Sequence, residues 1–142
     1  RIYMTRKIIM ILSSVTMGCL GVVLSFAPDV LLNVLNITNN SNALILVQIL
    51  GALYFSFGIL NWMTKDNLVG GIYNRPIVLA NFAHYLTGSL ALLKGHFFKA
   101  DASYTAWLLV TVYLFFSVSF YFILLNNQTL KDFSSSKSVV NK

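Results

Sequence analysis

The sequence is poor in charge, cysteine and proline. Its four acidic residues are all aspartate, it has one cysteine and two prolines, and only 10% of its 142 residues are charged. A soluble domain usually carries about 25% charged residues, so an ordinary water-facing surface is excluded. Because 57% of the residues are hydrophobic, a core of this size cannot hide them all from water. We therefore expect most of the chain to lie in lipid.

The few reactive residues exclude several kinds of site. Cys19 has no second cysteine for an internal disulfide, and no cysteine or histidine cluster has metal-ligand spacing. We therefore expect no metal and no cofactor, and we interpret Cys19 as a small buried hydrophobe. The net charge of +6 belongs to the segments around the apolar runs, which favours an anionic membrane surface and not nucleic acid as its partner.

Four apolar runs are long enough to cross a bilayer as helices that rise about 1.5 Å per residue. We predict an all-α, integral membrane four-helix bundle with short loops, formed by residues 1–126 as one domain. A short helix at about 29–37 is expected in the membrane interface, and residues 127–142 are expected to be a flexible basic tail. The predicted spans cover residues 8–26, 43–63, 76–93 and 104–125.

The first run has the features of a retained span and not of a cleaved signal peptide. Its apolar stretch is too long for a signal peptide, and Pro28 follows the small residue at the candidate cleavage site. The fourth run carries aromatic residues on nearly every side, so we expect it to have much contact with lipid.

Small residues recur at helical spacing and predict close helix packing. Ser14, Gly18, Gly21 and Ser25 share one face of the first run, where a neighbouring helix can approach closely. The second and third runs carry glycines of the same kind. The predicted helix-packing residues are Gly18, Gly21, Gly51, Gly58 and Gly88.

The distribution of lysine and arginine predicts an orientation. With four spans, both ends of the chain and the middle loop lie on one side, and eight of the ten Lys and Arg residues fall there. The positive-inside rule therefore places both termini in the cytoplasm.

Polar residues within the second and third runs predict an inward-facing seam. Asn81, His84 and Gly88 lie at i, i+3 and i+7 of one helix, and so share a face. An amide or imidazole against lipid costs several kcal/mol, roughly, by transfer scales. Asn61 lies a few residues before the middle loop, and Asn81 lies a few residues after it. In an antiparallel hairpin the two residues should therefore lie at a similar depth in the membrane. We predict a contact of Asn61 with Asn81 or with His84.

Three interpretations of this seam stay open. The favoured one is hydrogen bonding between helices, which stabilises membrane proteins by about 0.6 kcal/mol per contact. The second is a site for a small ligand, a lipid or a proton at Asn61, Asn81 and His84, because an ionisable group inside a membrane is a functional candidate. A catalytic role is disfavoured, since no carboxylate or second histidine accompanies His84. Gln48 lies near the opposite membrane surface and is excluded from the site.

The stretch Gly51…Gly58…Asn61-Trp62, a basic loop, and Asn81…His84…Gly88 together resemble small four-span membrane proteins of uncharacterised function found in bacteria. The resemblance covers residues 43–93 and implies a four-helix fold in a bacterial cytoplasmic membrane, with no known activity. We expect a non-enzymatic protein in contact with the lipid bilayer, with a ligand or lipid in the bundle. The alternatives are an accessory or scaffold subunit, self-associating or bound to a partner membrane protein, and a small channel or carrier.

Overall fold

The computed structural model is all-helical, which confirms the predicted fold class. It describes the backbone of residues 2–34, 40–66, 74–97 and 104–140, and the side chains of residues 4–34, 40–66, 74–95, 104 and 107–126. The helices are α1 (Ile2–Phe26), α2 (Pro28–Val34), α3 (Ser41–Thr64), α4 (Asn74–Phe97) and α5 (Tyr104–Val140).

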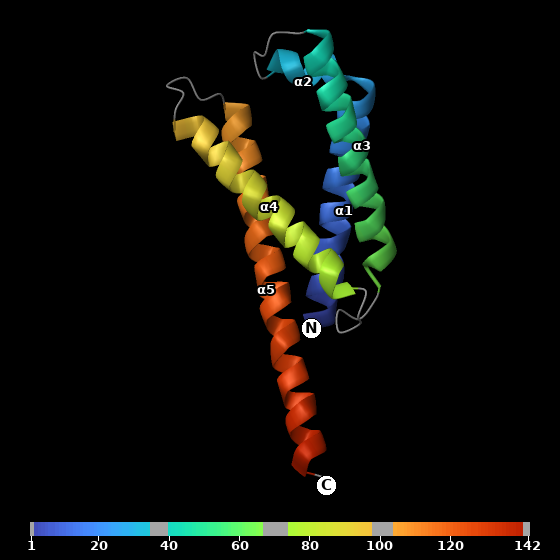
Figure 1. Cartoon of the computed structure of the whole chain (residues 1–142), viewed down its shortest axis with the longest axis vertical. Coiled ribbons are helices and arrows are strands. Elements are labelled where there is room, and N and C mark those ends of the chain that lie inside the picture. The colour runs from blue at the N-terminus through green and yellow to red at the C-terminus, as the bar shows by residue number, and fades with distance from the viewer. Residues whose placement is uncertain (1, 35–39, 67–73, 98–103, 141–142) are drawn as a thin grey trace.

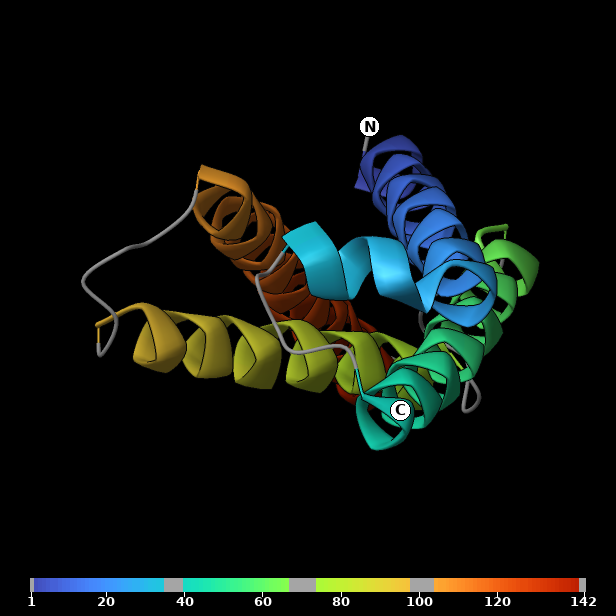
Figure 2. The ribbon, with the colours of Figure 1, turned by 90° about the horizontal axis from the view of Figure 1, so that it is seen from above.

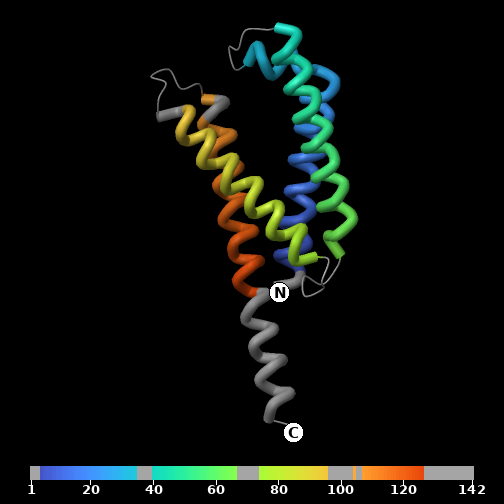
Figure 3. The backbone as a smooth tube through the Cα atoms, viewed as in Figure 1, coloured from blue at the N-terminus to red at the C-terminus, as the bar shows by residue number. Residues whose placement is uncertain are grey.

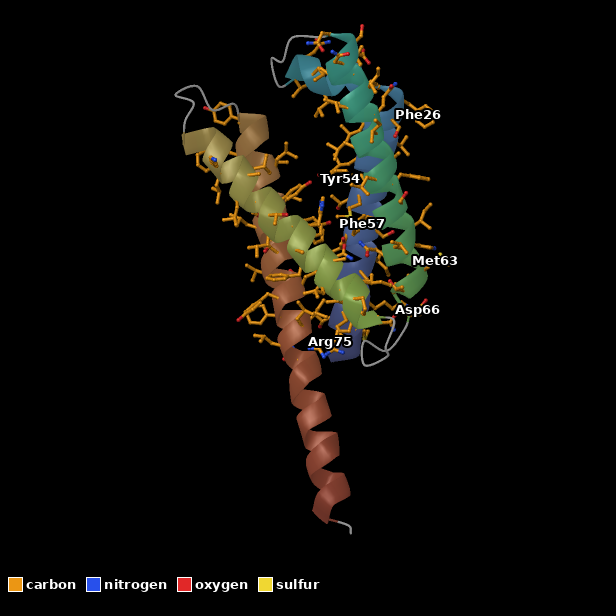
Figure 4. The ribbon with its side chains drawn as sticks, viewed as in Figure 1. Phe26, Tyr54, Phe57, Met63, Asp66 and Arg75 are labelled. Atoms are coloured by element: carbon orange, nitrogen blue, oxygen red, sulfur yellow. The ribbon has the colours of Figure 1, made fainter. Side chains whose placement is uncertain are left out.

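Four of the described helices are long and apolar enough to cross a membrane, and their spans agree with the predicted ones to within four residues at each end. The chain is therefore a multi-pass membrane protein by helix length and composition. Large apolar side chains point away from the bundle: Phe26 is 85% exposed and Met63 is 70% exposed (Figure 4). Such exposure is stable where the surrounding solvent is lipid. The spans are Met4–Phe26, Ser41–Thr64, Asn74–Gly95 and Trp107–Asn126.

The short helix α2 and the start of α3 follow from local sequence. Pro28 is the first residue of α2, where its missing N–H costs no hydrogen bond, and Asp29 follows it in the first turn. Asn40 caps α3, because its side-chain oxygen accepts a hydrogen bond of 2.7 Å from the backbone N–H of Ala43. The structure has a helix at Pro28–Val34, where a short helix at about 29–37 is predicted; its place in the membrane interface stays a prediction, and residues 35–37 lie outside the described ones.

The helices pack in two pairs, α1 with α3 and α4 with α5. The pairs lie together near the start of α4 and separate toward the end where α2 lies (Figures 1 and 3). Seen from above, α2 extends from the end of α1 across the space between the pairs (Figure 2). The molecule is therefore a wedge-shaped bundle, with the pairs joined at one end and spread at the other.

The α1–α3 pair is held at close range by small residues. A methyl group added at Gly58 would lie 2.8 Å from the backbone nitrogen of Gly18, and one at Gly21 would lie 2.7 Å from the Cα of Phe55. The Ser14 hydroxyl donates a hydrogen bond of 2.7 Å to the Gly58 carbonyl. The small-residue face predicted for the first span thus packs on α3, where glycine lets the two backbones touch.

The α4–α5 pair is packed with rings instead. Tyr85 stacks on Phe116 with ring centres 4.8 Å apart and also lies against Phe120. Gly88 makes room for a ring, because a methyl group there would lie 2.5 Å from Cε1 of Tyr113. The expectation of much lipid contact for the fourth span does not extend to Tyr113, Phe116 and Phe120, which are buried. Exposed rings of α5, such as Phe115 and Phe122, agree with it.

The expectation that Cys19 is buried is wrong. Cys19 is exposed on α1 and not buried, because it follows Gly18 and so points off the face that meets α3; a thiol against lipid costs little. The helix α5 continues through residues 127–140, where we expect a flexible tail. That segment contains no proline or glycine to end a helix. Its flexibility stays a prediction.

Candidate functional site

Asn61 and Asn81 join the two helix pairs. The Nδ2 of Asn61 donates to Oδ1 of Asn81 at 2.8 Å, and the Nδ2 of Asn81 donates back to Oδ1 of Asn61 at 2.7 Å. Both side chains are 0% exposed. The predicted contact between these residues is therefore confirmed, as a reciprocal pair of amide hydrogen bonds between α3 and α4.

The remaining donors of the two amides are also used. Asn61 Nδ2 donates a second hydrogen bond of 3.0 Å to Ser13 Oγ on α1, and Asn81 Nδ2 donates one of 2.9 Å to the backbone carbonyl of Ile77. Ser13 Oγ in turn is hydrogen-bonded to the Tyr85 hydroxyl at 2.8 Å. These four residues, Ser13, Asn61, Asn81 and Tyr85, form what we call the polar lock. It joins three helices and leaves no amide N–H of its own for a ligand.

A partly open cavity of about 500 Å³ lies between the helix pairs, toward α2. All five helices contribute to its wall. The wall is mainly leucine, with Leu24 from α1, Leu31 from α2, Leu50 from α3 and Leu109 from α5. Its volume falls within the roughly 300–1,000 Å³ typical of small-molecule sites.

His84 lies in the wall of this cavity among aromatic rings. The ring centre of Tyr54 lies 5.2 Å away with its edge toward the imidazole, and Phe57 is stacked at 5.8 Å. Tyr85 and Tyr113 lie on other sides, at 5.3 and 5.7 Å. Tyr54 and Phe57 extend from α3 toward α4 (Figure 4), and the hydroxyls of Tyr54 and Tyr113 are hydrogen-bonded to each other.

The Nε2 of His84 is buried and has no hydrogen-bond partner among the residues that the structure describes. A buried nitrogen of this kind costs free energy unless a partner satisfies it. His84 as a residue lines the cavity, whose other lining side chains are mostly apolar. His84 thus combines a place in the cavity wall with a ring nitrogen that no described residue satisfies.

The structure divides the three candidate ligand-binding residues into two groups. His84 lines the cavity, whereas Asn61 and Asn81 do not and are bonded to each other. Gln48, excluded from the site by its depth, donates a hydrogen bond of 3.5 Å to the backbone carbonyl of Ser25. Sequence reasoning missed Tyr54, Phe57 and Tyr113. The spacing of Tyr54 and Phe57 from Asn61, at i−7 and i−4, is the signal that places them on the same face of α3.

Within the described ranges, no three histidine, cysteine or acidic residues gather into a metal-binding group. The sequence matches no protein-family model, and neither a curated protein nor a solved structure matches the chain. The function must therefore be argued from the chemistry of the cavity and not from analogy.

Proposed function

We propose that this multi-pass membrane protein binds a small apolar molecule that carries one hydrogen-bonding group, in the cavity between its helix pairs. The observation that carries the proposal is that His84, whose Nε2 has no hydrogen-bond partner among the described residues, lines a largely apolar cavity. The ligand would place its polar group at His84 and its apolar body against Leu24, Leu50 and Leu109. A lipid or another hydrophobic metabolite has this chemistry.

The entry route supports a ligand that arrives from the bilayer. Leu50 of α3 and both Thr87 and Ala91 of α4 line the cavity and are exposed. The cavity thus reaches the lipid-facing surface between α3 and α4. A molecule already dissolved in the membrane needs no aqueous path to such a site.

The proposal is for binding and not for catalysis. The groups that surround His84 are rings of tyrosine and phenylalanine, and the described lining residues include no carboxylate and no second imidazole. General acid–base or nucleophilic chemistry with histidine commonly needs a partner group within hydrogen-bond reach. A hydrogen bond to a bound ligand needs only the one nitrogen.

We further propose that both termini lie in the cytoplasm of a bacterial cell. Arg6 and Lys7 on α1, Lys65 after α3 and Arg75 on α4 belong to one end of the bundle, where Asp66 and Arg75 lie close to the start of α1 (Figure 4). This grouping supports the orientation that the positive-inside rule predicts. The cavity then lies in the outer half of the membrane.

The test is photolabelling of the full chain in phosphatidylcholine nanodiscs with a fatty acid that carries a diazirine on its acyl chain. Two matched variants differ by one position on α5: Leu109→Trp fills the cavity, whereas Leu108→Trp changes a side chain that is 63% exposed and lines no part of it. We expect labelled peptides around residues 87–92 and 50–54, loss of most of this labelling in Leu109→Trp, and wild-type labelling in Leu108→Trp.

Equal labelling of both tryptophan variants, spread over the lipid-facing sides of all four spans, would contradict the proposal. His84→Ala provides a second check, because it removes the hydrogen-bonding nitrogen and leaves the leucine wall. If His84→Ala binds the probe as the wild type does, and the protein purifies with a stoichiometric partner, the accessory-subunit alternative replaces this one.

A further inference from the structure

A second groove lies between α1 and α5, and it shares no lining residue with the His84 cavity. Its volume is about 340 Å³. The α1 side includes Arg6 and Ile9, and the α5 side includes Ser119, Phe122 and Ile123. Arg6 and Asn126 belong to the ends of their spans, so the groove reaches the depth of lipid headgroups. It lies at the end of the bundle opposite α2.

Arg6 contributes an unusual group to this groove. Its Nε and Nη2 atoms are both buried, and neither has a hydrogen-bond partner in the described part of the chain. These two nitrogens carry N–H groups along one edge of the guanidinium plane, the edge that binds two oxygens of one anion side by side. A guanidinium stays charged in proteins, and Arg6 is half-buried, so an anion beside it would be stabilising.

No described acidic residue supplies that partner. Asp66 is 2.5 Å from the Nζ of Lys7, the residue next to Arg6, and so neutralises the neighbouring cation. Asp29 lies on α2, at the other end of the bundle (Figure 1). Among the residues whose side chains the structure describes, these are the two carboxylates. Within the described part of the chain, the charge of Arg6 therefore has no carboxylate partner.

We propose that the guanidinium of Arg6 binds the phosphate group of a phospholipid whose acyl chain lies along the groove. A phosphate presents two oxygens at the spacing of the guanidinium edge. The apolar side chains of Ile9, Phe122 and Ile123 lie deeper in the span, where an acyl chain would follow its headgroup. Basic pockets between transmembrane helices bind anionic headgroups by the same combination of charge and apolar surface.

The experiment uses the purified full chain in detergent, with native mass spectrometry and thermal unfolding as phosphatidylglycerol is added. We expect Arg6→Gln to weaken phosphatidylglycerol binding about tenfold or more, the effect of losing charged hydrogen bonds. Arg6→Lys keeps the charge but loses the pair of parallel N–H donors. It should bind phosphatidylglycerol nearly as poorly as Arg6→Gln does. The matched control is Arg75→Gln, which removes an exposed guanidinium at the same end of the bundle and should leave binding within about twofold.

A second variant keeps Arg6 and guards against a folding defect. Ser119→Phe places a ring in the groove and should also reduce binding, while unfolding in the absence of added lipid stays cooperative. Wild-type binding by Ser119→Phe, or equal losses in Arg6→Gln and Arg75→Gln, would overturn the proposal. A parallel titration with inorganic phosphate should give no shift of the unfolding temperature. A shift as large as that from the lipid would assign the site to a soluble phosphate and overturn the lipid assignment.

Discussion

The space between the two helix pairs is closed at one end and open at the other. The two ends differ in whether their polar side chains have hydrogen-bond partners within the protein. At the closed end, the amides of Asn61 and Asn81 use both of their N–H donors within the protein. At the open end, the Nε2 of His84 has no partner in the described chain. Asn81 and His84 lie three residues apart on one face of α4, so their shared position in sequence does not imply a shared role.

The difference teaches that a polar residue within a membrane span is a functional candidate only after its partners are counted. The polar lock stabilises the bundle because every amide donor is satisfied, and it offers no N–H to a ligand. The cavity has the opposite character, since a ligand would supply what His84 lacks. The substitutions below, taken from the largest expected effect on stability to the smallest, test what holds the bundle together, and a last comparison tests this contrast directly.

The largest effect is expected from Gly58→Ala, which acts on the helix pair that positions the closed end. The added methyl would lie 2.8 Å from the nitrogen and 3.0 Å from the Cα of Gly18, both backbone atoms that cannot move aside alone. We expect a loss of up to about 3 kcal/mol in the free energy of unfolding, typical of overpacking. Asn61, three residues further along α3, would move with the helix.

The measurement is reversible unfolding in mixed detergent micelles, with Gly18→Ala as the matched control. A methyl at Gly18 meets nothing within 4 Å, so this variant should be as stable as the wild type or slightly more stable, because alanine favours a helix. Equal losses from the two substitutions would show that close approach of α1 and α3 does not hold the pair together.

A smaller loss is expected when one amide of the polar lock is removed. Asn61→Leu leaves the Nδ2 of Asn81 without its interhelical acceptor, and should cost about 1–2 kcal/mol of unfolding free energy. Asn81→Leu should cost a similar amount. Because the double variant removes both partners, we expect it to be about 1 kcal/mol more stable than the two single losses predict by addition. Strict additivity in this double-mutant cycle would contradict a direct Asn61–Asn81 interaction.

A still smaller effect is expected at the ion pair of Lys7 and Asp66, whose side chains are 40% and 54% exposed. The hydrogen bond from Lys7 holds the pKa of Asp66 below its usual 3.8. Since the carboxyl has a lower pKa when folded, its stabilising effect is complete above about pH 4 and is lost as the pH falls through the folded value.

The difference in unfolding temperature between the wild type and Asp66→Asn should therefore be small at neutral pH, decrease with added salt, and narrow further as the pH is lowered below about 4. Thermal unfolding at several pH values measures it. A difference that stays constant across this range would exclude a stabilising role for the charge of Asp66.

Much of this architecture could be predicted from sequence because the bilayer imposes it. The four spans follow from the length of their apolar runs, and the meeting of Asn61 and Asn81 follows from their equal distance from one loop. The pairing of α1 with α3 could not be predicted in the same way. The small-residue face of α1 predicts that some helix packs closely against it. In lipid, however, an apolar helix face is as stable against lipid as against another helix, so hydrophobicity does not select the partner. The partner is selected by the fit of Gly51, Phe55 and Gly58 of α3 to this face.

The cavity could not be predicted either, because its parts come from separate helices. Tyr54, His84 and Tyr113 belong to three different helices and are far apart in sequence. Their contacts depend on how the two helix pairs pack against each other. The aromatics of the fourth span illustrate the difficulty, since rings on every side of a helix do not reveal which side faces lipid. Tyr113 is buried and Phe115, two residues later, is exposed. The sequence therefore marks His84 as a candidate but does not reveal its surroundings.

The most direct test of the contrast compares His84→Phe with Asn81→Leu in thermal unfolding, with and without oleic acid as the probe. His84→Phe replaces an imidazole that has an unsatisfied nitrogen with an apolar ring, at a position surrounded by other aromatic rings. Without oleic acid, this variant should therefore unfold at the wild-type temperature or slightly above it. It should also lose the stabilisation that oleic acid gives the wild type. Asn81→Leu should unfold at a lower temperature and keep that stabilisation. The account would be contradicted if His84→Phe were destabilised but still stabilised by oleic acid, while Asn81→Leu gained no stability from oleic acid. Such a result would mean that Asn81 and not His84 belongs to the binding site.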